Sequence, residues 1–197
     1  MQLLAALEWF PFLAGAYLLT RSVCALLDPQ ARYWPPDSRS GPGYVRFIWP
    51  FRMLTWGLVL VSLLAVSQVG PSIDSPRFWL GGVLLILGFG IAVHATLQLG
   101  WKVAFGQNGV LQKDGWLRFS RNPIYVATWI GLAGWALLLP KASILATVAV
   151  WAALYLPAIF LEERALAKTH GADYTDYKTR TARFLGWPRG RQAGMPT

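Results

Sequence analysis

Long uninterrupted apolar blocks dominate this sequence and restrict what it can fold into. Five blocks run over residues 3–27, 53–69, 78–99, 124–139 and 142–161. A helix needs roughly 17–25 residues to cross a hydrocarbon core of about 30 Å. Each block is long enough, or nearly so, to span a membrane. We therefore expect an all-α fold, a polytopic membrane helix bundle of about five transmembrane helices that forms one integral-membrane domain over residues 1–197.

The composition favours a membrane protein over a soluble enzyme. Hydrophobic residues make up 55% of the chain and charged residues only 14%, whereas a soluble domain carries about 25% charged residues. The single cysteine, Cys24, lies inside the first block and allows neither an intramolecular disulfide nor a Cys-x-x-Cys site. His94 and His170 have no cluster of further ligands around them in the sequence, so we expect no metal site.

Basic residues alternate between the loops. Of the 18 Lys and Arg residues, 15 fall between the first and second blocks, between the third and fourth, and in the C-terminal tail, while the other two loops hold two. The positive-inside rule assigns the basic side to the cytoplasm. We expect an inner or plasma membrane protein with its N-terminus outside and its C-terminus in the cytoplasm. Topology and attraction to anionic membrane lipids then explain the net charge of +9, without a nucleic-acid partner.

The connections between the blocks differ in composition on the two sides. Residues 28–44 are rich in Pro and Gly and predict a loop on the cytoplasmic surface. Trp34 in this loop is one of several tryptophans near block ends, where an indole prefers the headgroup level. Pro140 and Lys141 separate the last two blocks and predict a tight helical hairpin. Ala127 and Gly131, four residues apart, permit close helix contact.

The first polar segment of interest leads into the fourth block. Arg121 and Asn122 precede Pro123, a residue suited to the first turn of a helix. Free backbone N–H groups at such a helix start favour an anionic ligand group. The alternative is an ordinary interfacial helix start, with Arg121 on a lipid phosphate.

The second polar segment follows the fifth block. Glu162 and Glu163 lie at the membrane boundary, where two carboxylates are costly unless they are solvated or paired. Successive helical residues point about 100° apart, so we expect at most one of them to face the bundle interior. The alternative is that both are solvated. Past Gly171, Tyr174 and Tyr177 predict a short amphipathic helix over the cytoplasmic mouth.

These two segments carry recognisable spacings. The first runs from Gly115 to Tyr125 and contains Arg121-Asn122-Pro123. The second keeps Glu162-Glu163, Leu166, Gly171, Tyr174, Tyr177 and Arg183-Phe184 in register. Together they resemble the integral-membrane S-adenosylmethionine-dependent methyltransferases related to isoprenylcysteine carboxyl methyltransferase and phospholipid methyltransferases. The resemblance covers roughly residues 100–197, beyond the first three spans of residues 1–99, and places Asn122 where that family has a histidine.

The resemblance implies a cytoplasmic pocket for S-adenosyl-L-methionine and a lipophilic small-molecule or lipid acceptor that enters from the bilayer. An arginine suits the carboxylate of this cofactor and an acidic side chain suits its ammonium group. The implied catalytic residues are Arg121, Asn122 and Glu163. The implied cofactor-binding residues are Gln98, Val110, Leu111, Arg121, Asn122, Pro123, Tyr125, Glu162 and Glu163.

The expected activity is methyl transfer to a small lipophilic acceptor, which could be a carboxylate, amine, thiol or hydroxyl. Such an in-line displacement needs no covalent protein nucleophile, and positioning can supply much of the rate. Asn122 can form hydrogen bonds but cannot act as a base near neutral pH. The alternative is therefore a non-catalytic lipid-binding or assembly protein that retains the fold. A nicotinamide-dependent membrane reductase is a more distant alternative, because only 24 residues separate the third and fourth blocks.

Overall fold

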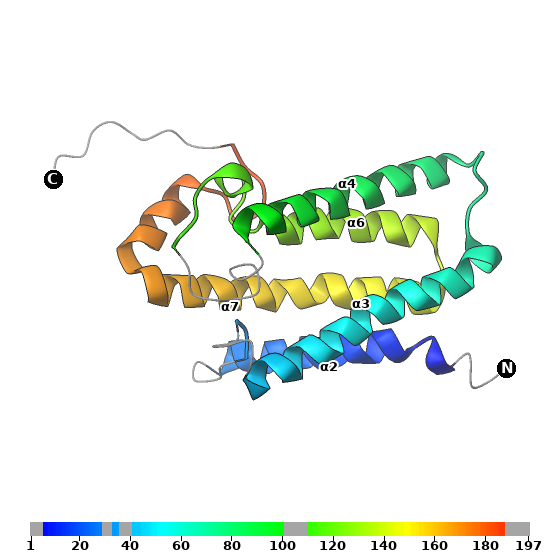
Figure 1. Ribbon diagram of the computed structural model, residues 1–197, viewed down its shortest axis with the longest axis horizontal. Coiled ribbons are helices and arrows are strands. Elements are labelled where there is room, and N and C mark those ends of the chain that lie inside the picture. The colour runs from blue at the N-terminus through cyan, green and yellow to red at the C-terminus, as the bar shows by residue number, and fades with distance from the viewer. Residues whose placement is uncertain (1–5, 29–32, 36–40, 101–109, 188–197) are drawn as a thin grey trace.

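The computed structural model describes residues 6–28, 33–35, 41–100 and 110–187, and all regular structure in these ranges is helical (Figure 1). The expectation of an all-α fold is confirmed for this part of the chain. The elements are α2 (Phe10–Leu27), α3 (Pro42–Val69), α4 (Pro76–Leu99), the 3-10 turn η1 (Gly115–Arg118), α6 (Pro123–Leu138) and α7 (Ala142–Arg180).

Four of these helices, α2, α3, α4 and α7, are long and apolar enough to cross a membrane. The fifth, α6, is apolar but has only 16 residues, a length of about 24 Å at 1.5 Å per residue. Two prolines set this length. Pro123 occupies the first turn of α6, and Pro140 disfavours helical geometry in the residue before it. Of the five expected spans, four are thus long helices and one, α6, is short.

The helix α3 begins earlier than the apolar block that it contains. It starts at Pro42, after an extended Gly41, and continues through Pro50, whereas the hydropathy pattern placed the start near Met53. Hydropathy reports which residues lipid can solvate, not where backbone hydrogen bonding starts. The predicted surface loop over residues 28–44 is correspondingly shorter.

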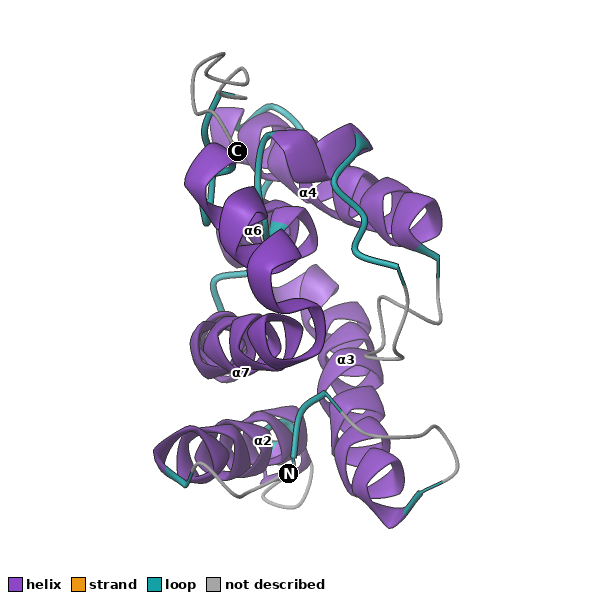
Figure 2. Ribbon diagram, turned by 90° about the vertical axis from the view of Figure 1, so that its left-hand side faces the viewer, coloured by secondary structure: helices purple, strands orange, loops and turns teal. Residues whose placement is uncertain are grey.

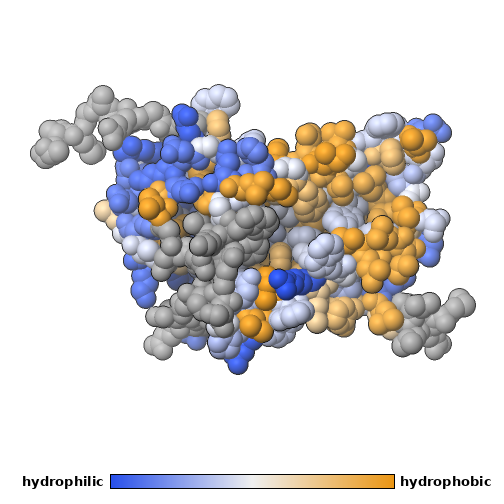
Figure 3. All heavy atoms as spheres, viewed as in Figure 1, coloured by the Kyte–Doolittle hydropathy of each residue, from blue (hydrophilic) through white to orange (hydrophobic). Residues whose placement is uncertain are grey.

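The polar ends of the helices gather on one side of the molecule. The end of α2, the start of α3, the end of α4, the start of α6 and the last part of α7 all lie at the left in Figure 1. Hydrophilic residues concentrate at this end, while hydrophobic residues cover most of the remaining visible surface (Figure 3). We call it the basic end. The expected hairpin between α6 and α7, at Pro140-Lys141, lies at the opposite end.

The helices pack as two groups on either side of α7. Figure 2 shows α4 and α6 together on one side, with α2 and α3 on the other. The most extensive helix contact is between α4 and α6. A Cβ at Gly88 would collide with the backbone of Gly131 and lie 2.7 Å from the carbonyl oxygen of Ala127. The close contact expected from Ala127 and Gly131 is confirmed.

A single glycine interrupts the long helix α7. Gly171 has φ 49° and ψ −117°, a left-handed conformation that favours glycine because it has no Cβ. The chain turns there and continues helically to Arg180 at the basic end (Figure 1). Beyond the turn, Tyr174 and Tyr177 are buried. They are packing residues of the short helix that the aromatic spacing predicts.

Candidate functional site

A cavity with a volume of about 260 Å³ lies at the basic end. Residues from the segment before α3, from α3, from α4, from the η1–α6 region and from α7 line it. Eight of the nine residues that the sequence places in a cofactor site are among them: Gln98, Val110, Leu111, Arg121, Asn122, Pro123, Tyr125 and Glu162. The ninth, Glu163, does not line the cavity. The structure therefore brings together residues that are up to 64 positions apart, from Gln98 to Glu162.

The start of α6 positions the first of these residues. The backbone N–H of Arg121 donates to the carbonyl oxygen of Ala182 at 2.9 Å, and that of Asn122 donates to Ser120 Oγ at 3.0 Å. Pro123 then begins the helix, and Tyr125 follows within its first turn. The motif segment is thus held in place by its own serine and by the chain that follows α7.

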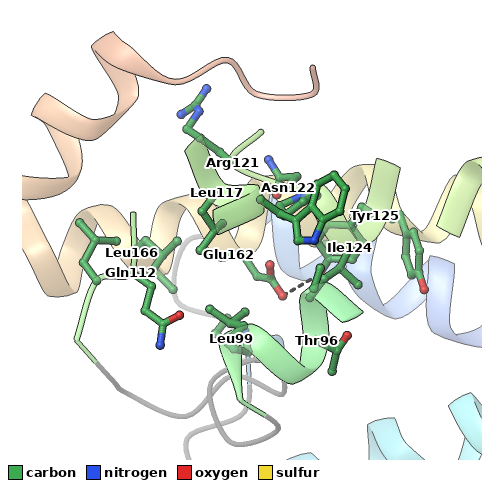
Figure 4. Close-up of a pocket in the computed structure, with 18 of the residues that line it drawn as sticks. Thr96, Leu99, Gln112, Leu117, Arg121, Asn122, Ile124, Tyr125, Glu162 and Leu166 are labelled. Atoms are coloured by element: carbon green, nitrogen blue, oxygen red, sulfur yellow. Dashed lines mark hydrogen bonds between the residues drawn. The ribbon is translucent and has the colours of Figure 1, made fainter. Parts of the chain in front are cut away.

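Glu162 extends its side chain into the cavity. Its carboxylate lies among the labelled lining residues in Figure 4. The hydroxyl of Tyr125 donates to Oε1 at 2.6 Å, and the indole N–H of Trp34 donates to the same oxygen at 2.7 Å. Among the residues that the structure describes, no Lys or Arg forms an ion pair with this carboxylate. Glu162 is thus a carboxylate inside the protein whose hydrogen-bond partners among the described residues are both neutral.

Glu163 points to a different set of partners. Arg183 donates from Nη2 to Oε2 at 2.9 Å and from Nε to Oε1 at 3.1 Å. Arg121 Nη1 lies 3.4 Å from Oε1. These hydrogen bonds to Glu163 raise the pKa of the Arg183 guanidinium above its usual value. We call Glu163, Arg121, Asn122 and Arg183 the Glu163 cluster.

Asn122 joins this cluster through its side chain. Nδ2 donates to the carbonyl oxygen of Arg183 at 3.1 Å and to Glu163 Oε1 at 3.4 Å. Asn is a preferred N-cap residue, yet this amide makes no capping bond to α6. Its hydrogen bonds instead tie the segment after α7 to the start of α6.

Arg121 belongs to the Glu163 cluster and also lines the cavity. Its side chain is 10% exposed, and its Nε and Nη1 atoms have no hydrogen-bond partner among the described residues. In Figure 4 its guanidinium points away from Glu162. The structure thus separates Arg121 from Glu162, two of the charged side chains that line the cavity, and leaves two buried nitrogen atoms of Arg121 without a hydrogen bond to the described residues.

Aromatic side chains form much of the cavity wall, and sequence analysis missed several of them. Trp34 is buried inside the protein, and its ring centroid lies 4.2 Å from that of Phe47. Phe51 and Tyr155 also line the cavity. The ring centroid of Tyr155 lies 4.5 Å from that of Tyr125. Local patterns carry no signal for Trp34, because its contact with Glu162 joins residues 128 positions apart.

The two histidines have different surroundings. Nδ1 of His94 accepts a hydrogen bond from the indole of Trp116 at 2.8 Å. His170 lines the cavity near the turn at Gly171. Over residues 6–28, 33–35, 41–100 and 110–187, no group of three or more His, Cys, Asp or Glu side chains is arranged to hold a metal ion.

Two curated relatives match 71% of this chain. They are the nickel-cobalt-cadmium resistance protein NccN of Alcaligenes xylosoxydans xylosoxydans and the cobalt-zinc-cadmium resistance protein CzcN of Cupriavidus metallidurans, each 25% identical over 142 residues. The match covers 66% and 65% of the lengths of these relatives, slightly less than two thirds. No solved structure matches the chain significantly.

A family model described as phospholipid methyltransferase matches residues 76–173. The matched region runs from the first turn of α4 to just past the turn at Gly171. It includes the first polar segment and the Glu162-Glu163 pair, but ends before Tyr174, Tyr177 and Arg183-Phe184. The chain thus carries a phospholipid methyltransferase family domain over residues 76–173.

Proposed function

We propose that this protein transfers a methyl group from S-adenosyl-L-methionine to a small lipophilic acceptor. The observation that carries the proposal is the Glu162 carboxylate, which lines a cavity of the family domain and has no cationic partner among the described residues. A carboxylate taken out of water is costly without a counter-charge. A ligand that brings an ammonium group into the cavity would supply that counter-charge.

The lining residues fit the charges of this cofactor. Glu162 would hold its ammonium group. Arg121, whose Nε and Nη1 atoms make no hydrogen bond to the described residues, would hold its carboxylate. Val110, Leu111 and Leu99, all at the cavity, would pack against its adenosine. When bound, the cofactor supplies an electrophilic methyl group on a sulfonium.

The remaining residues of the site orient and shield the reactants. Tyr125 holds the Glu162 carboxylate in place through its hydroxyl. Phe47, Phe51 and Leu154 give the cavity an apolar wall that fits a lipophilic acceptor and excludes water. Water exclusion strengthens the electrostatic interactions inside a site. The acceptor group is a carboxylate, amine, thiol or hydroxyl.

The proposal includes a location. Most Lys and Arg residues belong to the loops and tail of the basic end, and positive charge favours the cytoplasmic side. We propose an inner or plasma membrane protein whose cavity faces the cytoplasm and whose N-terminus lies outside.

The test is binding of S-adenosyl-L-methionine to the detergent-purified protein, with a nicotinamide dinucleotide as the control ligand. We expect a micromolar dissociation constant, or about −8 kcal/mol, and weaker binding after Glu162→Ala. No binding at millimolar concentration, or equal binding of the control ligand, would exclude the proposal.

A second candidate is a non-catalytic membrane protein that retains the fold. The observation that favours it is Asn122, which replaces a base and uses its amide to hold Arg183. The relatives named for metal resistance make a role in resistance to metal ions part of this candidate. Cofactor binding with no transfer of a labelled methyl group to a membrane lipid extract would support it over the enzyme.

A further inference from the structure

The two carboxylate oxygens of Glu162 differ: Oε1 accepts two hydrogen bonds, and Oε2 accepts none from the described residues. Tyr125 and Trp34 both donate to Oε1, and an oxygen of this kind has two lone pairs to offer. No hydrogen bond to Oε2 is made by the residues that the structure describes. Both donors are neutral, so they orient the carboxylate without cancelling its charge.

We propose that Trp34 is a positioning residue of this site. Its indole N–H, together with the Tyr125 hydroxyl, turns Oε1 of Glu162 away from the ligand and leaves Oε2 as the acceptor that the ligand meets. This inference takes the identity of the ligand from the proposed function. The hydrogen bond between Trp34 and Glu162 does not depend on it, because it is present in the protein without a ligand.

Trp34 is held firmly enough to act in this way. Its ring packs on Phe47 at a centroid distance of 4.2 Å, and Phe47 stacks on Phe51 at 5.5 Å. The neighbouring Tyr33 meets the edge of Phe47 at 6.2 Å and lies under the guanidinium of Arg21. A donor whose ring is locked by packing fixes the direction of its hydrogen bond.

The consequence concerns the N-terminal half of the chain. Trp34 lies outside the region that matches the family model, residues 76–173, yet it reaches a glutamate inside that region. The N-terminal part of the chain therefore contributes a hydrogen-bond donor to the site through Trp34, in addition to the apolar wall of Phe47 and Phe51 and the packing of α2 and α3 against α7.

The test begins with a pair of matched variants in the full chain. Trp34→Phe keeps an aromatic ring on Phe47 but removes the N–H. The control is Trp135→Phe, which removes an N–H that donates to Ser62 Oγ at 2.8 Å, away from the residues that line the cavity. Hydrogen bonds to charged groups contribute more than neutral ones. We expect S-adenosylhomocysteine to bind about tenfold more weakly to Trp34→Phe, and with unchanged affinity to Trp135→Phe.

A double-mutant cycle without ligand separates positioning from simple packing. The melting temperature is measured for Trp34→Phe, Glu162→Ala and the double variant. If Trp34 acts through Glu162, its effect shrinks when Glu162 is absent, because residues in direct contact are not additive. Additive losses of melting temperature would overturn the proposal, as would unchanged ligand affinity in Trp34→Phe when the wild type binds.

The same data distinguish failure of this inference from failure of the proposed function. A wild type that does not bind the nucleoside ligand, but shows a non-additive cycle, excludes the cofactor while the Trp34–Glu162 contact stands. A wild type that binds, but shows an additive cycle, keeps the cofactor and overturns the positioning role.

Discussion

Two adjacent glutamates of α7 lie in opposite kinds of environment. Glu162 lines the cavity and accepts hydrogen bonds only from the neutral Trp34 and Tyr125 among the described residues. Glu163 is 11% exposed and is engaged by two arginines, Arg121 and Arg183. The difference follows from helical geometry, because neighbouring residues on a helix point about 100° apart.

The two carboxylates therefore have different roles. The charge of Glu163 is compensated inside the protein, and its bonds fix the start of α6 to the segment after α7. The charge of Glu162 is not compensated by the described residues, and its free oxygen faces a cavity. A buried carboxylate without a counter-charge lowers the free energy of unfolding, and the binding of a cation beside it raises that free energy again. We infer that Glu163 acts mainly in stability and Glu162 mainly in binding.

The largest expected effect is on Glu163. Glu163→Ala leaves Arg121 and the partly buried Arg183 without their counter-charge, and breaking a buried ion pair from one side costs about 3 kcal/mol. We expect the free energy of unfolding in detergent to fall by that order. The control is Asp176→Ala, whose pair with Arg180 is more than 40% exposed on both sides and contributes at most about 1 kcal/mol. Equal losses in the two variants would contradict a structural role for Glu163.

The next effect is on ligand binding through Glu162. Glu162→Gln keeps an oxygen that Tyr125 and Trp34 can bond but removes the charge. We expect the affinity for S-adenosyl-L-methionine to fall by about 2 kcal/mol, the scale of a hydrogen bond to a charged group. Stability is expected to stay level or rise, because an uncompensated acid is removed. Calorimetric titration measures the affinity, and thermal unfolding measures the stability. A loss of stability as large as that of Glu163→Ala would contradict the inference that Glu162 acts mainly in binding.

A smaller effect is expected at Tyr125. Tyr125→Phe keeps the ring against Tyr155 and removes the hydroxyl that donates to Glu162. Trp34 still donates to Oε1 in this variant, so we expect only part of a hydrogen bond to a charged group to be lost, about 1 kcal/mol, which weakens binding roughly fivefold. The control is Trp129→Phe, which removes an indole N–H that donates to the Ala152 carbonyl oxygen at 3.0 Å, away from the residues that line the cavity. A larger loss of affinity in the control than in Tyr125→Phe would place the binding determinant elsewhere.

The smallest effect is expected at Arg183. Arg183→Met keeps an aliphatic chain over Phe160, where the guanidinium now lies 4.7 Å from the ring centroid. Arg183 is 37% exposed, so solvent weakens its pair with Glu163. We expect a loss of at most about 1 kcal/mol in the free energy of unfolding. A loss matching that of Glu163→Ala would show that Arg183, rather than Arg121, is the main partner of Glu163.

Hydropathy and motif spacing predicted much of this molecule because both act locally. Apolar blocks fixed where the long helices are, and the two prolines around α6 fixed its length. The motif around Pro123 and the Glu162-Glu163 pair identified Arg121, Asn122, Tyr125 and Glu162, which meet at the cavity, and also Glu163, which does not line it. The prediction that at most one glutamate faces the interior gave no means of choosing between them.

The parts that escaped prediction depend on contacts between distant segments. Trp34 lies in a stretch whose Pro and Gly content predicts a surface loop, and nothing nearby in the sequence points to Glu162. The role of Asn122 is equally non-local, because its amide bonds to the carbonyl of Arg183, 61 residues away. The start of α3 at Pro42 was missed because polar residues such as Arg46 can continue a helix outside the apolar layer.

The turn at Gly171 has a consequence for how this chain can vary over generations. A Cβ built at this position would meet no atom within 4 Å, so inspection of contacts alone would score any substitution as harmless. The backbone conformation, φ 49°, nonetheless disfavours every residue with a side chain. Tyr174, Tyr177 and Arg183 all follow this turn and owe their places to it. A substitution at Gly171 would displace residues that Gly171 does not contact. The backbone conformation, not steric crowding, therefore restricts which residues can replace it.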